Sequence, residues 1–259
     1  MENKKSTIKF ILLYIVVAYV LSGIGYYINH RGSAAGLFLT ILAPMISSFL
    51  VYFLNHRKMK LMICKFSLCG IVVGAAIAAG YLLVSFLLFL LMGNQLGNYR
   101  ITGDFVAETV LLYLFAGFCE EVGWRGMLLP MVKKVMKLED ACLVTGIVWF
   151  GWHVPLIVGG EMISEHTLSI GLLLFLIEVL SITFIMGVLS ETKMGQSIWT
   201  YVSLHAIHNI IIQLILSKLN TKQSRFFGDA GYLLIAVLVV TAIGIWFYAK
   251  KKIKNFNYG

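Results

Sequence analysis

Charged residues, prolines and cysteines are scarce in this chain of 259 residues. Charged residues form 13% of the sequence and hydrophobic residues form 59%. Soluble domains contain about 25% charged and about 45–50% apolar residues, so this composition excludes a water-soluble globular protein. With only 3 Pro and 4 Cys, disorder, collagen-like repeats and a disulfide scaffold are excluded too. The composition therefore predicts a polytopic membrane protein.

The net charge of +9 does not indicate nucleic-acid binding. No basic patch interleaved with aromatic residues stands apart from the apolar runs, and no separate soluble domain is evident that would bind a polyanion. Lys and Arg also anchor the cytoplasmic ends of membrane-spanning helices. We therefore expect a lipid bilayer around the chain and no nucleic-acid partner.

Eight apolar runs are long enough to cross a bilayer core of about 30 Å, which requires about 20 residues in a helix. The runs cover residues 10–28, 35–54, 68–92, 105–132, 141–158, 168–189, 197–217 and 230–249. The first follows three lysines, as in a signal peptide, but its length favours a retained span. Because the connections are short, the sequence predicts an all-α protein with a single integral membrane domain over residues 1–259.

The basic residues divide unequally between the two sides of these eight spans. Fifteen lie on the side of the termini: Lys4, Lys5, Lys9, Arg57, Lys58, Lys60, Lys65, Lys133, Lys134, Lys137, Lys193, Lys250, Lys251, Lys252 and Lys254. Five lie on the other side: Arg31, Arg100, Lys218, Lys222 and Arg225. Because cytoplasmic loops are rich in Lys and Arg, this division predicts that both termini are cytoplasmic.

Several charged or polar residues fall inside the predicted spans, where a charge costs at least about 2.5–3.5 kcal/mol on insertion scales. They are Glu108, Glu120, Glu121, Arg125 and Glu178, together with His153, His205 and His208. Such residues commonly face a cavity or pair with one another. Each of them therefore calls for an explanation.

Glu121 and Arg125 are four residues apart, so they share one helix face and can form a charge-assisted pair. Glu120 lies about 100° around the helix and can point into a cavity while its neighbours hold the helix in place. A purely structural ion network of all three is the alternative interpretation.

The fifth and seventh spans contribute the histidines. Trp149 and His153 are four residues apart, and the following Pro155 predicts a break in the helix at His153. His205 and Asn209 share one face of the seventh span, which favours a polar cavity. For His153 alone, a hydrogen-bonded packing role is the alternative.

Depth in the membrane supplies an independent test. At 1.5 Å per residue from the cytoplasmic ends, Glu120 and His153 lie roughly 20 Å deep, and His205 and Asn209 roughly 12 and 18 Å deep. These side chains can therefore meet in one layer near the midplane.

The fourth span is too long to cross the bilayer straight. A helix over residues 105–132 would measure roughly 42 Å, which predicts a tilt or a break near Gly123, Gly126 or Pro130. A break there would admit water beside Glu120.

Three motifs in three separate spans resemble one family of membrane proteins. Glu120-Glu121-Val122-Gly123-Trp124-Arg125 is similar to its EExxxR motif, Trp149 with His153 to its FxxxH motif, and His205-Ala206-Ile207-His208-Asn209 to its HxxxN motif. The family is the CPBP family, also called Abi, of CAAX prenyl endopeptidases and bacteriocin-processing or self-immunity proteins. Its motif core would cover about residues 105–217, and the number of spans resembles that of its endopeptidases. Trp149 stands where the family usually has Phe, and His208 is an additional polar residue.

The resemblance implies an intramembrane endopeptidase that cleaves near the cytoplasmic half of the membrane. Glu120 and His153 would hold and activate the attacking water, with Glu120 as general base, and a desolvated carboxylate is a stronger base. His205 and Asn209 would donate hydrogen bonds to the developing oxyanion, each worth typically about 2.7–4 kcal/mol. The implied role is maturation or degradation of a peptide or membrane protein, or bacteriocin self-immunity, in a bacterial plasma membrane.

Two features of this mechanism stay open in the sequence. Glu121 and Arg125 would either orient Glu120 or help to hold the substrate backbone. Glu120, His153 and His205 would also form a plausible zinc set with one open position, whereas a metal-free glutamate mechanism needs no cofactor.

Other chemistries fit less well. Ser197 is expected at a helix entrance rather than as a nucleophile, and Cys119 as a packing residue, while Glu178 would line the same cavity or pair with His208. Cys64 and Cys69 lie near the reducing face and Cys119 and Cys142 lie in or beside spans, so no disulfide is expected.

The main alternative function is a non-catalytic immunity factor or a regulatory partner of a sensor kinase. A third is a transporter with a Glu and His proton relay.

Overall fold

The computed structural model describes residues 4–55, 66–97, 101–159, 166–219 and 224–252. The helices are α1 (Lys4–His30), α2 (Ala34–Leu54), α3 (Leu68–Leu91), α4 (Gly103–Gly123), the π-helix η2 (Trp124–Leu128), α5 (Leu129–Lys133), α6 (Leu138–Val158), α7 (Leu168–Ser190), the 3₁₀ turn η3 (Met194–Gln196), α8 (Ile198–Leu216) and α10 (Tyr232–Lys252). Within the described residues there is no strand, so the all-α prediction is confirmed.

Each of the eight predicted runs is helical. Seven helices in the described residues are long and apolar enough to cross a membrane: α1, α2, α3, α6, α7, α8 and α10. Helix α4 does not qualify because it carries four acidic residues, Asp104, Glu108, Glu120 and Glu121. The chain is a multi-pass membrane protein, and a total of eight spans stays a prediction.

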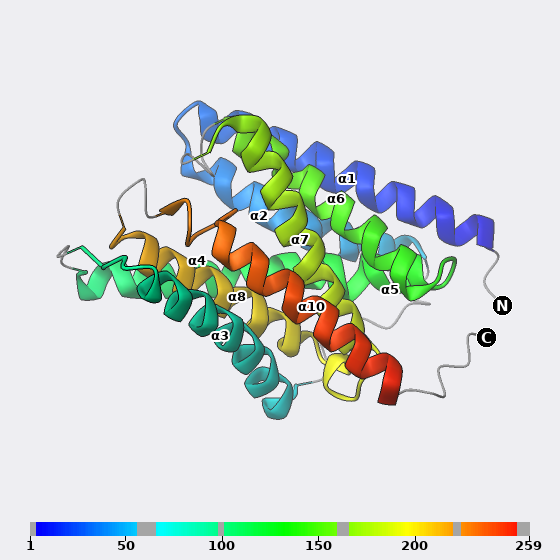
Figure 1. Ribbon diagram of the computed structural model, residues 1–259. Coiled ribbons are helices and arrows are strands. Elements are labelled where there is room, and N and C mark those ends of the chain that lie inside the picture. The colour runs from blue at the N-terminus through cyan, green and yellow to red at the C-terminus, as the bar shows by residue number, and fades with distance from the viewer. Residues whose placement is uncertain (1–3, 56–65, 98–100, 160–165, 220–223, 253–259) are drawn as a thin grey trace.

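The helices contact one another in a closed circuit (Figure 1). The order of the helices around the circuit is α1, α2, α4, α8, α3, α10, α7 and α6, and α6 contacts α1. Neighbours in this circuit are often distant in the sequence, as with α3 and α8. The circuit therefore brings the three motif-bearing segments into one bundle, although they come from separate parts of the chain.

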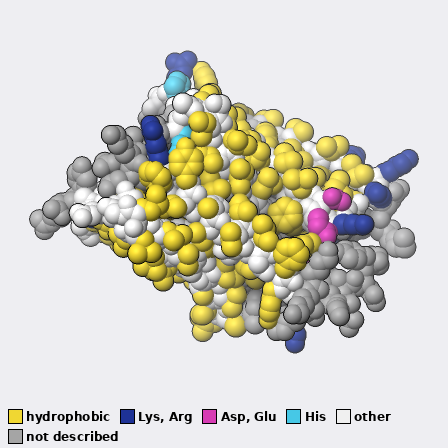
Figure 2. Space-filling model, viewed as in Figure 1, with side chains coloured by type: hydrophobic (Ala, Val, Ile, Leu, Met, Phe, Trp, Pro, Cys, Tyr) yellow, Lys and Arg dark blue, Asp and Glu magenta, His cyan; other side chains and the backbone are white. Residues whose placement is uncertain are grey.

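The outer surface fits a lipid environment. Figure 2 shows hydrophobic side chains over the middle of one face and charged side chains toward its edges. The start of α1 and the end of α10 lie at the same end of the bundle in Figure 1. This agrees with an even number of crossings, and the cytoplasmic placement of that end stays a prediction. Seven of the counted basic residues, Arg57, Lys58, Lys60, Lys65, Arg100, Lys222 and Lys254, lie outside the described residues, as does Cys64.

The predicted break in the fourth run is confirmed. The π-helix η2 begins directly after Gly123, and the Leu129 N–H donates to the Trp124 carbonyl oxygen, five residues back. In a regular helix the ring of Pro130 would press against the carbonyl of Gly126, and the wider π turn relieves this contact. Such π segments occur frequently at functional sites, and this one follows the two motif glutamates.

The predicted break at His153 is wrong. Helix α6 continues through Pro155 and ends at Val158. Pro155 lacks an N–H and so removes one hydrogen bond of the helix, but it lies only three residues before the helix ends. Proline inside a membrane helix is tolerated where neighbouring helices compensate for the lost bond. His153 is therefore held on a regular helix.

Three helices begin at polar caps that satisfy free backbone N–H groups. Ser67 accepts from Gly70 N at the start of α3, and Thr102 accepts from Phe105 N at the start of α4. Ser197 accepts from Trp199 N at the start of α8. The prediction that Ser197 lies at a helix entrance is therefore confirmed.

Candidate active site

Arg125 connects three elements behind the site. Its Nη1 donates to Glu121 Oε1 at 3.0 Å, and its Nη2 donates to Thr183 Oγ1 on α7 at 3.0 Å. Its guanidinium carbon lies 4.1 Å from the centre of the Trp149 ring on α6. Both Arg125 and Glu121 are buried, so breaking this pair would leave an uncompensated charge, at a cost of about 3–5 kcal/mol.

Glu121 also contacts the third motif. Its Oε1 accepts from His205 Nδ1 at 2.8 Å, so one oxygen atom receives both Arg125 and the histidine of α8. With Nδ1 facing Glu121, the imidazole presents its Nε2 edge elsewhere. This contact fixes the orientation of the His205 ring relative to α4.

Glu120 is oriented by the residue in which the chain departs from the family pattern. Trp149 Nε1–H donates to Glu120 Oε2 at 2.9 Å. A phenylalanine at this position has no such donor. The substitution of Trp for Phe therefore gives Glu120 a fixed partner, and its Oε1 is the oxygen available for a further bond.

His153 has a defined tautomer. A carbonyl oxygen can only accept, so His153 Nδ1–H donates to the Trp149 carbonyl at 2.9 Å, and Nε2 carries the lone pair. The ring is packed edge-on against Trp152, with centroids 4.6 Å apart, and against Phe175, at 5.1 Å. These contacts fix the direction of Nε2.

Glu120, His153, His205 and Asn209 line one cavity of about 390 Å³. Its walls come from α2, α4, α6, α7 and α8, together with Asp229 in the segment before α10. Glu121 and Arg125 do not line it. The four candidate catalytic side chains are thus brought together, and the two supporting ones lie behind them.

A second polar group lines the same cavity. Glu178 Oε1 lies 3.1 Å from His208 Nε2, and His208 Nδ1 lies 2.8 Å from the hydroxyl of Tyr81 on α3. The sequence left open whether Glu178 lines the cavity or pairs with His208, and it does both. Tyr81 and Asp229 were not predicted, because no spacing in the sequence connects them to this group.

The zinc set suggested by the sequence does not fit this geometry. Of the described residues, only Glu178, His208 and Asp229 form a group of at least three His, Cys, Asp or Glu side chains with ligand atoms within 4.8 Å of one another. The ligand atoms of Glu120, His153 and His205 therefore do not all lie within 4.8 Å of one another. Zinc holds its ligand atoms at about 2.0–2.2 Å, so they lie roughly 3.3 Å from one another.

Two other sequence expectations can be checked. Cys119 is fully buried and packs in a small apolar cluster with Ile41 and Ala116, which fits a packing role. Cys69, Cys119 and Cys142 are free thiols among the described residues. Glu108 is exposed on α4, away from the cavity.

Two comparisons with known proteins cover the part of the chain that forms this site. The family model described as Type II CAAX prenyl endopeptidase Rce1-like matches residues 102–211, which contain all three motifs. The chain is also 27% identical over 262 residues to a protein named CAAX prenyl protease 2 from Methanococcus maripaludis, across 91% of each chain. The protein is an intramembrane endopeptidase that acts on a peptide or membrane protein in the bilayer. Both similarities support the resemblance to the CPBP family that the three motifs indicate.

Proposed function

We propose that the protein hydrolyses a peptide bond with a water molecule held between Glu120 and His153, and that no metal takes part. The observation that carries the proposal is the single cavity lined by Glu120, His153, His205 and Asn209. The Trp149 Nε1–H donates to Oε2 of Glu120, which leaves Oε1 to accept from the water. The Nε2 lone pair of His153 can accept a second hydrogen bond from this water. Two acceptors on one water orient its remaining lone pairs toward a substrate.

The attack transfers one proton and forms one bond. Glu120 takes a proton from the water as the water oxygen bonds to the carbonyl carbon of the substrate. The π electron pair of the carbonyl moves onto the carbonyl oxygen. Glu120 then gives this proton to the leaving amine as the C–N bond breaks. The carboxylate is thereby regenerated, and no cofactor is consumed. General-base catalysis of this kind contributes typically about 10²–10⁴-fold.

His205 and Asn209 are the proposed oxyanion donors. They lie one helical turn apart on α8, so both side chains reach the same wall of the cavity. Glu121 accepts a hydrogen bond from His205 Nδ1, and in its imidazolium form His205 would also donate through Nε2–H. The amide of Asn209 supplies the second donor. In other enzymes, removing one oxyanion donor lowers kcat about 10²–10³-fold.

The proposed substrate has an extended peptide segment beside an apolar membrane group. Apolar side chains such as Leu37, Ile41 and Phe175 line the cavity together with the polar ones. The relative named above is a CAAX prenyl protease, so a prenylated CAAX peptide is the first substrate to test. We place the reaction in the plasma membrane of a bacterium, near its cytoplasmic half.

The test compares two glutamates of the same helix. Purified protein in lipid vesicles is incubated with a farnesylated CAAX peptide and, in parallel, with the same peptide lacking the prenyl group. We expect Glu120→Gln to lower the cleavage rate at least 100-fold, whereas Glu108→Gln, an exposed residue of α4, leaves it unchanged.

Contrary results would separate the alternatives. Equal cleavage by wild type and Glu120→Gln would refute the general base. A zinc ion that the wild type binds and Glu120→Gln loses would refute the metal-free mechanism. A biological phenotype that persists in Glu120→Gln without any cleavage would favour an immunity factor or a partner of a sensor kinase.

A further inference from the structure

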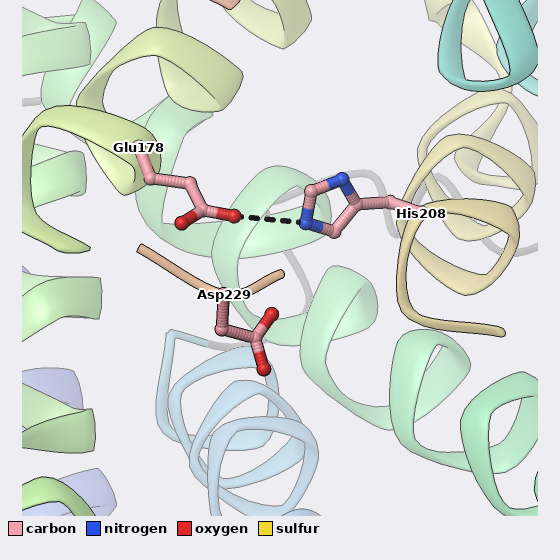
Figure 3. A group of neighbouring side chains, drawn as sticks. All are labelled: Glu178, His208 and Asp229. Atoms are coloured by element: carbon pink, nitrogen blue, oxygen red, sulfur yellow. Dashed lines mark hydrogen bonds and ion pairs between the residues drawn. The ribbon is translucent and has the colours of Figure 1, made fainter. Parts of the chain in front are cut away.

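Glu178, His208 and Asp229 form a second group of ligand-type side chains apart from the proposed catalytic residues (Figure 3). They come from α7, α8 and the segment before α10, and their ligand atoms lie within 4.8 Å of one another. Figure 3 shows the Glu178 carboxylate pointing toward the His208 ring, with the carboxylate of Asp229 to one side of the line between them. We propose that this group binds one divalent cation, zinc, on the wall of the catalytic cavity.

The ligand set favours zinc chemically. Imidazole nitrogen and carboxylate oxygen are both ordinary zinc ligands, and three protein ligands leave a fourth position for water. The Glu178 oxygen and His208 nitrogen are already 3.1 Å apart, close to the roughly 3.3 Å expected between ligands of a tetrahedral zinc. The carboxylate of Asp229 would have to move inward by an ångström or more. A divalent ion would also offset the charge of two carboxylates in one group.

Hydrogen bonds from neighbouring groups orient two of the three ligands. The Tyr81 hydroxyl contacts His208 Nδ1 at 2.8 Å, and by accepting from it would leave Nε2 to face the metal. The Ala230 N–H donates to Glu178 Oε2 at 2.7 Å, so Oε1 faces His208. Metal ligands in proteins typically have such partners, which fix the tautomer of the histidine and the direction of the carboxylate. All three ligands also line the cavity, so the proposed ion would lie on its wall.

The cation would connect elements that carry the active site. His208 lies beside Asn209 and three residues after His205 on α8, so a bond between His208 and zinc would fix the rotation of α8 about its axis. Glu178 would tie α8 to α7, and Asp229 would tie both to the segment before α10. This role is distinct from the hydrolytic step and does not depend on it.

Zinc binding to the purified full-length protein tests the proposal. The protein is isolated in detergent through a tag without histidine, stripped with a chelator and titrated with zinc. Bound metal is measured by mass spectrometry after desalting, and affinity by calorimetry. We expect one zinc per chain, with binding weakened at least 10-fold in His208→Gln and in Asp229→Asn. Tyr81→Phe, which removes an outer contact, should weaken it about 10- to 100-fold.

Two controls separate this site from other possibilities. Gln213→Leu changes another side chain of α8 that lines the cavity, and Glu120→Gln changes the catalytic glutamate; both should retain the zinc. Loss of zinc in Glu120→Gln with retention in Asp229→Asn would overturn the proposal. So would a wild type that binds no more zinc than Asp229→Asn. If His208→Gln does not fold, Asp229→Asn and Tyr81→Phe decide the outcome alone. Because zinc is counted directly, failure here leaves the peptidase mechanism untouched.

Discussion

Replacing Trp149 with Phe removes one hydrogen-bond donor from Glu120 and keeps an aromatic ring beneath Arg125. The lost bond joins Nε1 to a carboxylate oxygen at 2.9 Å inside a buried site. Hydrogen bonds to charged groups contribute about 1.5–3 kcal/mol, which corresponds to a factor of roughly 10–100 if the bond is needed in the transition state. Since the family usually has Phe in this position, the variant should fold.

The assay measures kcat and KM for peptide cleavage by Trp149→Phe and by Trp152→Phe. Trp152 also lines the cavity, but its Nε1 donates to Ser22 on α1 rather than to Glu120. We expect kcat to fall about 10- to 100-fold in Trp149→Phe with little change in KM, because the bond orients the base rather than the substrate. Trp152→Phe keeps an aromatic ring beside His153 and should lower kcat less than Trp149→Phe. An unchanged or higher kcat in Trp149→Phe would refute the orienting role.

Three further variants test other parts of the structure. Asn209→Ala should lower kcat about 10²–10³-fold in the same cleavage assay, and an unchanged kcat would exclude it as an oxyanion donor. Gly74→Ala places a Cβ against the Thr200 carbonyl oxygen, whereas Gly80 of the same helix has open space around it. Thermal unfolding in detergent should show a loss of about 1–3 kcal/mol for Gly74→Ala and none for Gly80→Ala, and equal stabilities would contradict this packing. Arg125→Ala should destabilise the protein by about 3–5 kcal/mol in the same measurement, and a loss below 1 kcal/mol would contradict a buried pair.

The helices could be predicted because each depends on a local property of the sequence. Apolar runs of span length specify them without knowledge of their neighbours. The break after Gly123 followed from excess length together with nearby glycine and proline. The expected break at Pro155 was wrong because the local preference of a pre-proline residue is weaker than the constraint from packed neighbouring helices.

The site was predictable only in part. The pair of Glu121 and Arg125 follows from a spacing of four residues on one helix. The approach of α6 and α8 to α4 was indicated by comparable depth and by the family resemblance, but not by any local pattern. Thr183, Tyr81 and Asp229 reach their partners through the order of helices around the circuit, which a single sequence does not encode in its spacing.

The most direct test of the central claim compares new peptide termini in membranes of cells that carry the wild type, Glu120→Gln or Glu108→Gln at matched abundance. Hydrolysis by Glu120 predicts a set of termini present with the wild type and with Glu108→Gln and absent with Glu120→Gln. These termini would also identify the substrate. Identical sets in all three membranes, with the biological phenotype intact in Glu120→Gln, would contradict the proposed mechanism.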